Sequence, residues 1–121
     1  MTRRILVVED QEDNRRIIRD LLTSAGYEMI EALDGEAGVR LAESERPDLI
    51  LMDIQLPVLD GHEATRRIKQ NPELRHIPII VVTSYALSGD DVKAFEAGCD
   101  AYVTKPFNPR QLLAKIQEHL R

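Results

Sequence analysis

The sequence contains a single cysteine, no long apolar run and no excess of positive charge, and each shortage excludes a class of protein. Cys99 has no second cysteine with which to form an internal disulfide, and it lacks the clustered Cys and His ligands of a zinc site. We therefore predict that Cys99 is a small buried residue.

The apolar runs are too short for a membrane protein or an exported one. None approaches the ~18 residues that a membrane-spanning helix needs. The opening Met1-Thr2-Arg3-Arg4 leads into an apolar run of only four residues, which is too short for the core of a signal peptide. We expect the protein to stay in the cytoplasm.

The formal net charge of -5 argues against direct binding of nucleic acid, whose phosphates repel an acidic protein. The basic residues at 15–16 and 66–69 are expected on solvated helix faces, since acidic residues surround them. The histidines His62, His76 and His119 are expected at the surface, away from any functional site.

The composition that remains is that of a globular domain. Hydrophobic residues make up 43% of the chain and charged residues 31%, which is usual for a soluble protein. A chain of 121 residues suits one domain, which would bury roughly two thirds of the surface exposed on unfolding. No linker or low-complexity tract interrupts it. We predict one domain spanning residues 1–121.

Five strand-like segments recur along the chain, four of them apolar and the one at 27–32 more polar, and a segment with helical spacing follows each of them. The strand-like segments are 5–8, 27–32, 49–52, 79–83 and 101–104. Strands joined by helices must run parallel, because each connection crosses back over the sheet. The predicted fold is a flavodoxin-like (βα)5 doubly wound α/β sandwich with a five-stranded parallel sheet.

Several residues mark the ends of the predicted helices. The first helix includes Ile17 and Ile18 among apolar residues at helical spacing. Asp34 and Ser88 precede the second and fourth helices, where their side chains can cap the first turn. Gly98 is placed to end the fourth helix in a left-handed turn.

The stretch from Asp48 to Pro57 predicts a central strand that ends at a carboxylate. Its apolar residues at 49–52 are consecutive, which is typical of a strand buried on both faces, and they lead directly into Asp53. Pro57 and Gly61 then prevent regular structure from continuing. Asp53 therefore stands at the carboxyl end of a strand, where open α/β sheets bind their ligands.

Four other polar residues follow or close the predicted strands in the same way, namely Glu9, Asp10, Thr83 and Lys105. In a parallel sheet all of these meet at one edge. Carboxylates gathered so closely repel each other and favour a cation, and Mg²⁺ suits such oxygen ligands. A metal, an ammonium and a hydroxyl together are what a phosphoryl group requires.

Through these residues the chain resembles the CheY-like receiver domain of two-component response regulators, and the resemblance covers essentially the whole chain. The matching motifs are Val7-Val8-Glu9-Asp10, the loop from Asp53 to Gly61, Thr83, Gly98-Cys99-Asp100-Ala101-Tyr102 and Lys105-Pro106. The chain is also similar to the single-domain DivK type through Asp20-Leu21-Leu22 and Gly26-Tyr27-Glu28.

The resemblance implies a phosphoacceptor signalling domain and not an enzyme, although such a domain takes part in its own phosphotransfer and autodephosphorylation. Asp53 would accept a phosphoryl group from a histidine kinase or a phosphotransfer protein. Asp10, Asp53 and the backbone carbonyl of Gln55 would ligate Mg²⁺, and Glu9 would act through bound water.

The resemblance further implies that Thr83 and Lys105 hold the phosphoryl oxygens. Thr83 and Tyr102 would form a switch, in which Tyr102 turns inward as the hydroxyl of Thr83 moves toward the phosphoryl group. Lys105 must turn back toward the site as it leaves its strand, so we expect a cis peptide bond before Pro106.

A downstream protein would bind a surface formed by the helix from Ser88 to Ala97, the Tyr102 strand and the last helix. The protein is expected to be a monomer or a weak dimer.

Three rival functions fit the sequence less well. A flavodoxin-like cofactor carrier would need a Ser/Thr/Gly-rich loop after the first strand, where this chain has acidic residues. A Mg²⁺-dependent phosphatase-like hydrolase would want a second acid two residues after Asp53, and that position is Gln55. A pseudo-receiver that acts only as an interaction module would be expected to lack one of the acids or Lys105.

Overall fold

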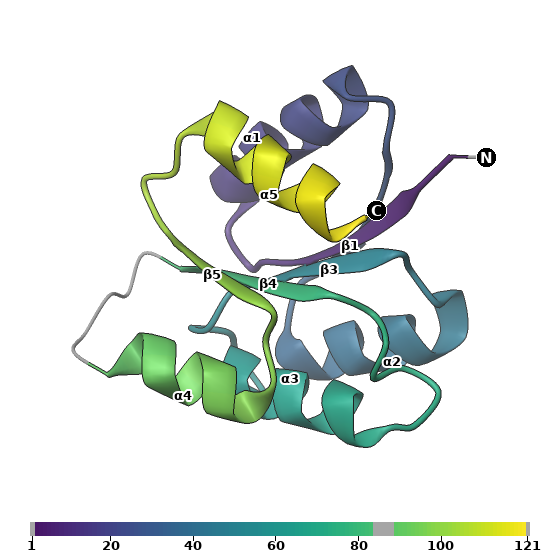
Figure 1. Cartoon of the computed structure of the whole chain (residues 1–121), viewed down its shortest axis with the longest axis vertical. Helices are drawn as coiled ribbons and strands as arrows, with labels where there is room; N and C mark the ends of the chain where they lie inside the picture. Colours follow the sequence, from purple (N-terminus) through teal and green to yellow (C-terminus); the bar gives the residue numbers. More distant parts are fainter. Residues whose placement is uncertain (1, 84–88, 121) are drawn as a thin grey trace.

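The computed structural model describes residues 2–83 and 89–120. In these ranges each of five strands is followed by a helix (Figure 1). The elements are β1 (Arg4–Val8), α1 (Glu12–Ser24), β2 (Glu28–Ala32), α2 (Gly35–Glu45), β3 (Leu49–Met52), α3 (Gly61–Gln70), β4 (Ile79–Thr83), α4 (Asp90–Ala97), β5 (Ala101–Thr104) and α5 (Pro109–His119).

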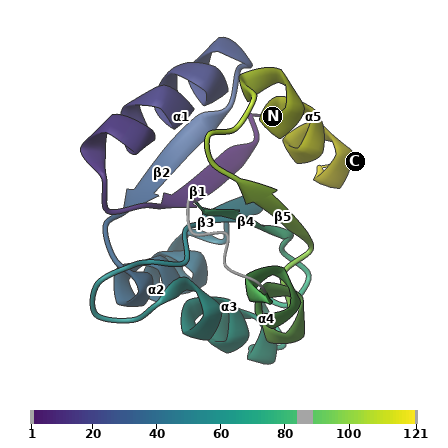
Figure 2. The same cartoon turned by 90° about the vertical axis from the view of Figure 1, so that its left-hand side faces the viewer.

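The strands form one parallel sheet in the order β2-β1-β3-β4-β5. Helices α1 and α5 cover one face, and α2, α3 and α4 cover the other, as Figures 1 and 2 show from two directions. The order reverses between β1 and β3, which is the usual position of a ligand site in a doubly wound sheet. The predicted flavodoxin-like sandwich is confirmed.

The sheet separates two apolar cores. Alternate residues of a strand point to opposite faces, so Leu6 of β1 enters the core under α2, α3 and α4, while Ile5 enters the core under α1 and α5. Every residue of β3 is buried, because helices cover both faces of this central strand. This packing holds the carboxyl ends of β1, β3 and β4 side by side.

The helix ends agree in part with the predicted caps. The Asp34 side chain accepts a hydrogen bond from the Ala37 backbone N–H at 2.7 Å, and Gly98 adopts a left-handed φ of 110° after α4. Ser88 lies outside the described residues, and Gly89 occupies the N-cap position of α4 without a side-chain cap. Within the described ranges, no helix is both long and apolar enough to cross a membrane.

Gly61 is needed for the close approach between the start of α3 and the end of β3. Its N–H donates to the Ile54 carbonyl at 2.8 Å, and a Cβ atom at this position would lie 1.9 Å from the Asp53 carbonyl oxygen. Only a residue without a side chain fits there. The contact fixes the loop that begins at Asp53.

Candidate functional site

The carboxyl ends of four strands bring the predicted site residues to one edge of the sheet. Glu9 and Asp10 follow β1, Asp53 follows β3, Thr83 ends β4 and Lys105 follows β5. Figure 2 faces this edge, with the loops that carry these residues toward the viewer. Parallel pairing and register alone produce this gathering, since the residues are far apart in the sequence.

Three carboxylates lie close enough together to share a metal ion. One oxygen atom each from Glu9, Asp10 and Asp53 lies within 4.8 Å of the others. Glu9 and Asp53 are buried, with exposed fractions of 2% and 8%, whereas Asp10 is exposed. A cation can therefore approach from the side of Asp10. Oxygen donors of this kind, with room for water on one side, suit Mg²⁺.

Lys105 brings one positive charge to these acids. Its Nζ atom donates a hydrogen bond to Glu9 Oε1 and lies 3.5 Å from Asp53 Oδ2. The Lys105 side chain is 9% exposed, so water screens these interactions poorly. One ammonium cannot neutralise the charge of three neighbouring carboxylates. The remaining negative charge favours binding of a further cation.

Backbone N–H groups orient the two buried carboxylates. Asp53 Oδ1 accepts a hydrogen bond from the Ile54 N–H at 2.7 Å, and Glu9 Oε2 accepts one from the Gln11 N–H at 3.2 Å. The Asp53 N–H continues the sheet pairing and donates to the Val8 carbonyl at 3.0 Å. Asp53 Oδ2 is thus directed toward Lys105.

Thr83 and Lys105 are joined through the backbone. Thr83 is fully buried and pairs with Thr104 in the β4–β5 register. The Lys105 N–H donates to the Thr83 carbonyl at 2.7 Å, and the Lys105–Pro106 peptide bond is cis. Lys105 therefore leaves β5 beside Thr83, at the edge where the acids lie.

Tyr102 lies on β5, away from the acids along the strand. It is half-buried and packs against the core under α2, α3 and α4. It also lines a pocket of about 270 Å³ with residues of the following loop and of α5. This position agrees with a strand aromatic that reaches the surface between β5 and α5.

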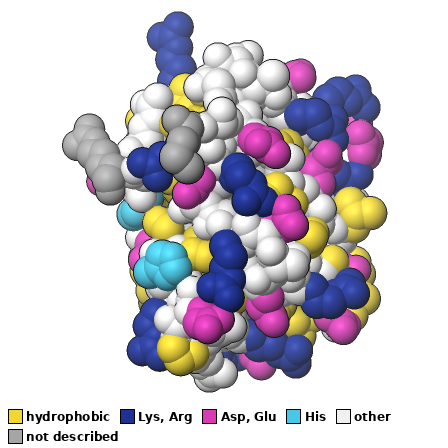
Figure 3. Space-filling view, turned by 90° about the vertical axis from the view of Figure 1, so that its right-hand side faces the viewer, with side chains coloured by type: hydrophobic (Ala, Val, Ile, Leu, Met, Phe, Trp, Pro, Cys, Tyr) yellow, Lys and Arg dark blue, Asp and Glu magenta, His cyan; other side chains and the backbone are white. Residues whose placement is uncertain are grey.

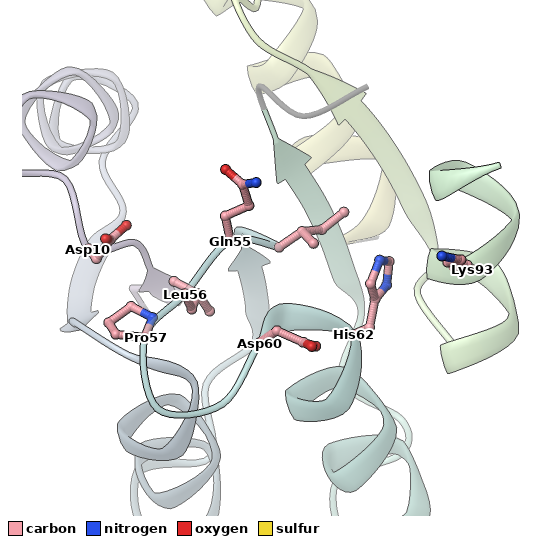
Figure 4. A pocket seen from close by; sticks show the side chains of 8 residues that line it. Asp10, Gln55, Leu56, Pro57, Asp60, His62 and Lys93 are labelled. Carbon is pink, nitrogen blue, oxygen red and sulfur yellow. The ribbon is translucent and has the colours of Figure 1, made fainter. Parts of the chain in front are cut away.

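An open pocket of about 480 Å³ adjoins the acidic cluster (Figure 4). Its lining residues are Asp10, Ile54, Gln55, Leu56, Pro57, Asp60, His62 and Lys93. Gln55 is exposed there, next to the edge where its carbonyl is expected to serve as a ligand. The pocket extends the site from the acids toward α3 and α4.

His62 was expected outside the site, and this prediction is wrong. Its side chain lines the pocket, on the side of Lys93 and opposite Asp10 in Figure 4. The His62 Nδ1 atom is buried and has no hydrogen-bond partner in the described part of the chain. The sequence indicates that residue 62 lies in the first turn of a helix, but only the packing of α3 beside α4 places it in this pocket.

Arg15 was also placed wrongly, because it is buried and not on a solvated helix face. Its exposed fraction is 8%. Its guanidinium contacts the Glu9 carbonyl and the side chains of Glu12 and Glu31. Arg16 agrees with its prediction, since its side chain is 62% exposed. One of the partners of Arg15, Glu31, belongs to β2. The spacing of residues within the first helix cannot reveal a contact with another element.

The loop after Asp53 contains one unusual backbone conformation. Val58 has a φ of 70°, which is rare for a β-branched residue. Its side chain is exposed, and the Leu59 N–H beside it donates to the Pro57 carbonyl at 2.8 Å. The conformation turns the loop back toward α3, where Asp60 Oδ1 caps the helix by accepting from the Glu63 N–H.

A family model described as the response regulator receiver domain matches residues 5–117. The chain belongs to this family. The match covers four strands in full, all of β1 except Arg4, and the acids, threonine and lysine at the carboxyl ends. This receiver domain is a phosphoacceptor of two-component signalling.

Individual relatives agree with the family in sequence and in structure. The chain is 43% identical over 120 residues to the polar-differentiation response regulator DivK of Brucella ovis, covering 99% of this chain and 98% of that protein. The receiver domain of sensor histidine kinase PA1611 from Pseudomonas aeruginosa is 42% identical with a TM-score of 0.92, over 99% and 98% of the two chains. A CheY-like receiver domain protein of Methanospirillum hungatei is 36% identical with a TM-score of 0.93, over 99% and 94%.

Proposed function

We propose that Asp53 is the residue of this receiver domain that accepts the phosphoryl group. The observation that carries the proposal is the arrangement around its carboxylate. Asp53 Oδ1 is held by the Ile54 N–H, and Oδ2 lies 3.5 Å from the Lys105 ammonium within the acidic cluster. An oriented carboxylate next to fixed positive charge is suited to attack phosphorus, since the charge stabilises the incoming oxygens.

The two other acids are less suitable acceptors. Both oxygens of Glu9 are engaged, Oε1 by Lys105 and Oε2 by the Gln11 N–H. Asp10 is exposed, and its carboxylate lies on the open side of the cluster. These two residues are better placed to bind a cation than to attack a phosphoryl donor.

Mg²⁺ is the proposed cofactor. Asp10, Asp53 and the Gln55 carbonyl would hold it directly, and Glu9 would act through a bound water. When bound, the ion neutralises charge on the phosphoryl oxygens and on the acids. The PA1611 receiver domain, described with a magnesium ion coordinated in its active site cleft, supports this proposal.

In the proposed transfer, a carboxylate oxygen of Asp53 forms a bond to phosphorus while the bond from phosphorus to the donor histidine nitrogen breaks. The electron pair of the broken bond stays on the histidine. Lys105 and Thr83 hold the phosphoryl oxygens, and water later releases phosphate from Asp53. The domain thus carries the phosphoryl group on Asp53 and returns to its unphosphorylated form, and it does not convert a separate substrate.

The phosphodonor is proposed to be a histidine kinase or a phosphotransfer protein that docks beside Lys105. A partly apolar pocket of about 320 Å³ lies there, lined by Asn14, Ile17, Lys105, Pro106, Phe107 and Pro109. Ile17, which shares the apolar spacing of its helix, is 51% exposed. An apolar side chain of the donor can bury this surface and bring its phosphohistidine to Asp53.

The output is proposed to be a change in the surface of α4, β5 and α5. Val92 and Phe95 of α4 are exposed, and Tyr102 lines the pocket between β5 and α5. Thr83 lies at the start of the connection to α4, so a shift of its hydroxyl toward the phosphoryl group can reach this surface through Tyr102. A downstream protein would then bind there.

We propose that the chain acts as one domain over residues 1–121, in the cytoplasm, as a monomer or weak dimer that does not contact nucleic acid directly. These properties suit a regulator that signals through protein–protein contacts. The size and net charge of the chain support this assignment.

Phosphorylation with acetyl phosphate tests the proposed acceptor. Intact-mass spectrometry should show one added phosphoryl group on the wild type with Mg²⁺ and none after chelation, because the acids then repel the donor. Asp53→Ala should not be modified. Modification of Asp53→Ala at the wild-type rate would refute the assignment, and catalytic release of phosphate over many turnovers would favour a hydrolase.

The proposed output can be followed with beryllofluoride, which mimics a phosphoryl group. Amide chemical shifts in β5 and α5 should change in the wild type and change much less in Thr83→Ala, because the route begins at the threonine hydroxyl. Shifts confined to the acids, or an equal distant response in the variant, would contradict the route.

A further inference from the structure

Arg15 is a buried arginine that links three elements next to the acidic cluster. Its Nη1 atom donates to the Glu9 carbonyl at 3.0 Å, and its Nη2 atom donates to Glu12 Oε2. Its Nε atom lies 3.3 Å from Glu31 Oε1 but lacks the geometry of a hydrogen bond. The guanidinium thus joins the end of β1 to α1 and β2.

The contact with Glu9 completes a set of interactions that immobilises this residue. The Glu9 N–H donates to the Ala32 carbonyl at 3.0 Å, and the Glu9 carbonyl accepts from Arg15. The carboxylate is held by Lys105 and by the Gln11 N–H. Both backbone groups and both side-chain oxygens of Glu9 therefore have partners.

The direction of the backbone at Asp10 is linked to the position of the Glu9 carbonyl. The Glu9 carbonyl belongs to the peptide plane that joins Glu9 to Asp10, and a planar peptide leaves only two soft rotations per residue. Fixing that oxygen therefore fixes the direction in which the chain enters Asp10. The Asp10 carboxylate is exposed, yet one of its oxygens lies within 4.8 Å of oxygens of Glu9 and Asp53.

The charge of Arg15 is already matched by other groups. Glu12 and Glu31 contact its guanidinium, and Glu31 also contacts Arg19 through Oε1 at 2.6 Å. Arg15 is thus not needed to neutralise the metal-binding acids. Its planar fork is what lets it hold a carbonyl and carboxylates together, which a lysine cannot do.

We infer that Arg15 is a positioning residue for the metal site. Through the Glu9 carbonyl it holds the Glu9–Asp10 peptide so that the Asp10 carboxylate meets those of Glu9 and Asp53. This inference rests on the proposed function, since it concerns the affinity of the same acids for Mg²⁺. Substituting a residue that orients metal ligands without itself binding the metal typically lowers metal affinity by about 10- to 100-fold.

The test compares Arg15→Met and Arg15→Lys with Arg19→Met. Arg19 lies on the same helix and contacts the same oxygen of Glu31, but its recorded hydrogen bond and ion pair do not involve Glu9. Titration of Mg²⁺ into the ¹⁵N-labelled, unphosphorylated proteins gives the affinity, and the metal-free spectra report the Glu9 and Asp10 amides. Circular dichroism checks that each variant is folded.

We expect Arg15→Met to bind Mg²⁺ about tenfold more weakly than the wild type and to shift the Glu9 and Asp10 amides without metal. Arg15→Lys should fall between the two, and Arg19→Met should stay within about twofold of the wild type. At saturating Mg²⁺ the rate of phosphorylation by acetyl phosphate should largely recover in the Arg15 variants, because the acceptor and Lys105 are intact.

A folded Arg15→Met with wild-type affinity and unchanged amide shifts would overturn the inference. If Arg15→Met does not fold, Arg15→Lys decides in the same way. An equal loss in Arg19→Met would also overturn it, because the effect would then belong to Glu31. Failure of the wild type to bind Mg²⁺ would instead refute the proposed function, so the two failures can be told apart.

Discussion

The two ends of the sheet use charged residues in different ways. At the carboxyl ends of the strands, three acids and Lys105 converge and two of the acids are buried. At the other end, the pairs Arg3–Asp48, Arg4–Glu45 and Arg46–Glu73 are separate and all partly exposed. Figure 3 shows that end, where Lys and Arg side chains are interspersed with Asp and Glu.

The difference separates a functional arrangement of charge from a structural one. Exposed pairs of opposite charge satisfy each other and add little to stability. A cluster with more negative than positive charge is instead costly until a cation arrives, and that cost makes the site responsive to Mg²⁺ and to a phosphoryl group. The following experiments perturb both ends, from the largest expected effect to the smallest.

Glycine substitutions should give the largest contrast. Gly61→Ala should destabilise the fold by more than about 3 kcal/mol, since overpacking would force the Asp53 backbone to move. Gly26→Ala, in the turn before β2, should cost about 1–2 kcal/mol, because its φ of 85° is unfavourable for alanine but nothing lies within 4 Å of the added Cβ. Denaturant unfolding measures both, and equal losses would contradict the close contact at Gly61.

Removing one positively charged side chain from each end should give the next largest difference in the free energy of unfolding. Lys105→Met should lower the free energy of unfolding by about 3 kcal/mol without metal, because it leaves buried carboxylates without a counter-charge. Mg²⁺ should restore part of the loss. Arg46→Met should cost less than about 1 kcal/mol, since its partner Glu73 is exposed. A Lys105→Met loss that Mg²⁺ does not reduce would show that the lysine acts only through packing.

Removal of one acid from the cluster should stabilise the metal-free protein. Asp10→Asn should raise the free energy of unfolding by about 1 kcal/mol in chelator, because it relieves repulsion among the carboxylates. In saturating Mg²⁺ the sign should reverse, since a ligand is lost. Asp13→Asn, in an exposed ion pair with Arg16, is the control and should change little. A destabilised Asp10→Asn in chelator would argue against repulsion.

Cys99, in the connection between α4 and β5, should show the smallest effect on the free energy of unfolding. Burial, assisted by the charge of Asp100, raises the pKa of its thiol from 9.0 to about 11. The folded state thus favours the neutral thiol. The contribution of this thiol to the free energy of unfolding is constant below pH 9 and is lost as the pH rises toward 11. A disulfide reagent should react slowly with the folded protein at pH 8 and rapidly in denaturant; equal rates would show that the thiol is accessible.

Much of the site could be predicted because the rule that places it is local. A polar residue directly after an apolar strand lies at the carboxyl end of that strand, and parallel strands share one edge. Asp53 and Lys105 follow this rule, and Gly98 follows the rule for helix ends. The helix cap at Ser88 could not be decided from sequence, because Gly89 can take the same position.

The residues that were placed wrongly depend on partners from distant elements. His62 lines the pocket because α3 packs beside α4, whose Lys93 lies on the same side. The left-handed φ of Val58 was not predicted either, because a β-branched residue rarely adopts it. Neither spacing nor composition carries this information.

The sequence by itself determined the order of strands and helices, the parallel sheet and the set of polar residues at its edge, since apolar periodicity and turn residues act over a few positions. The tertiary structure decided how those polar residues are used. It paired Lys105 with Glu9, turned Asp53 Oδ2 toward the lysine and buried Arg15 against the Glu9 carbonyl. Such contacts join residues far apart in the chain, so they arise only when the elements pack.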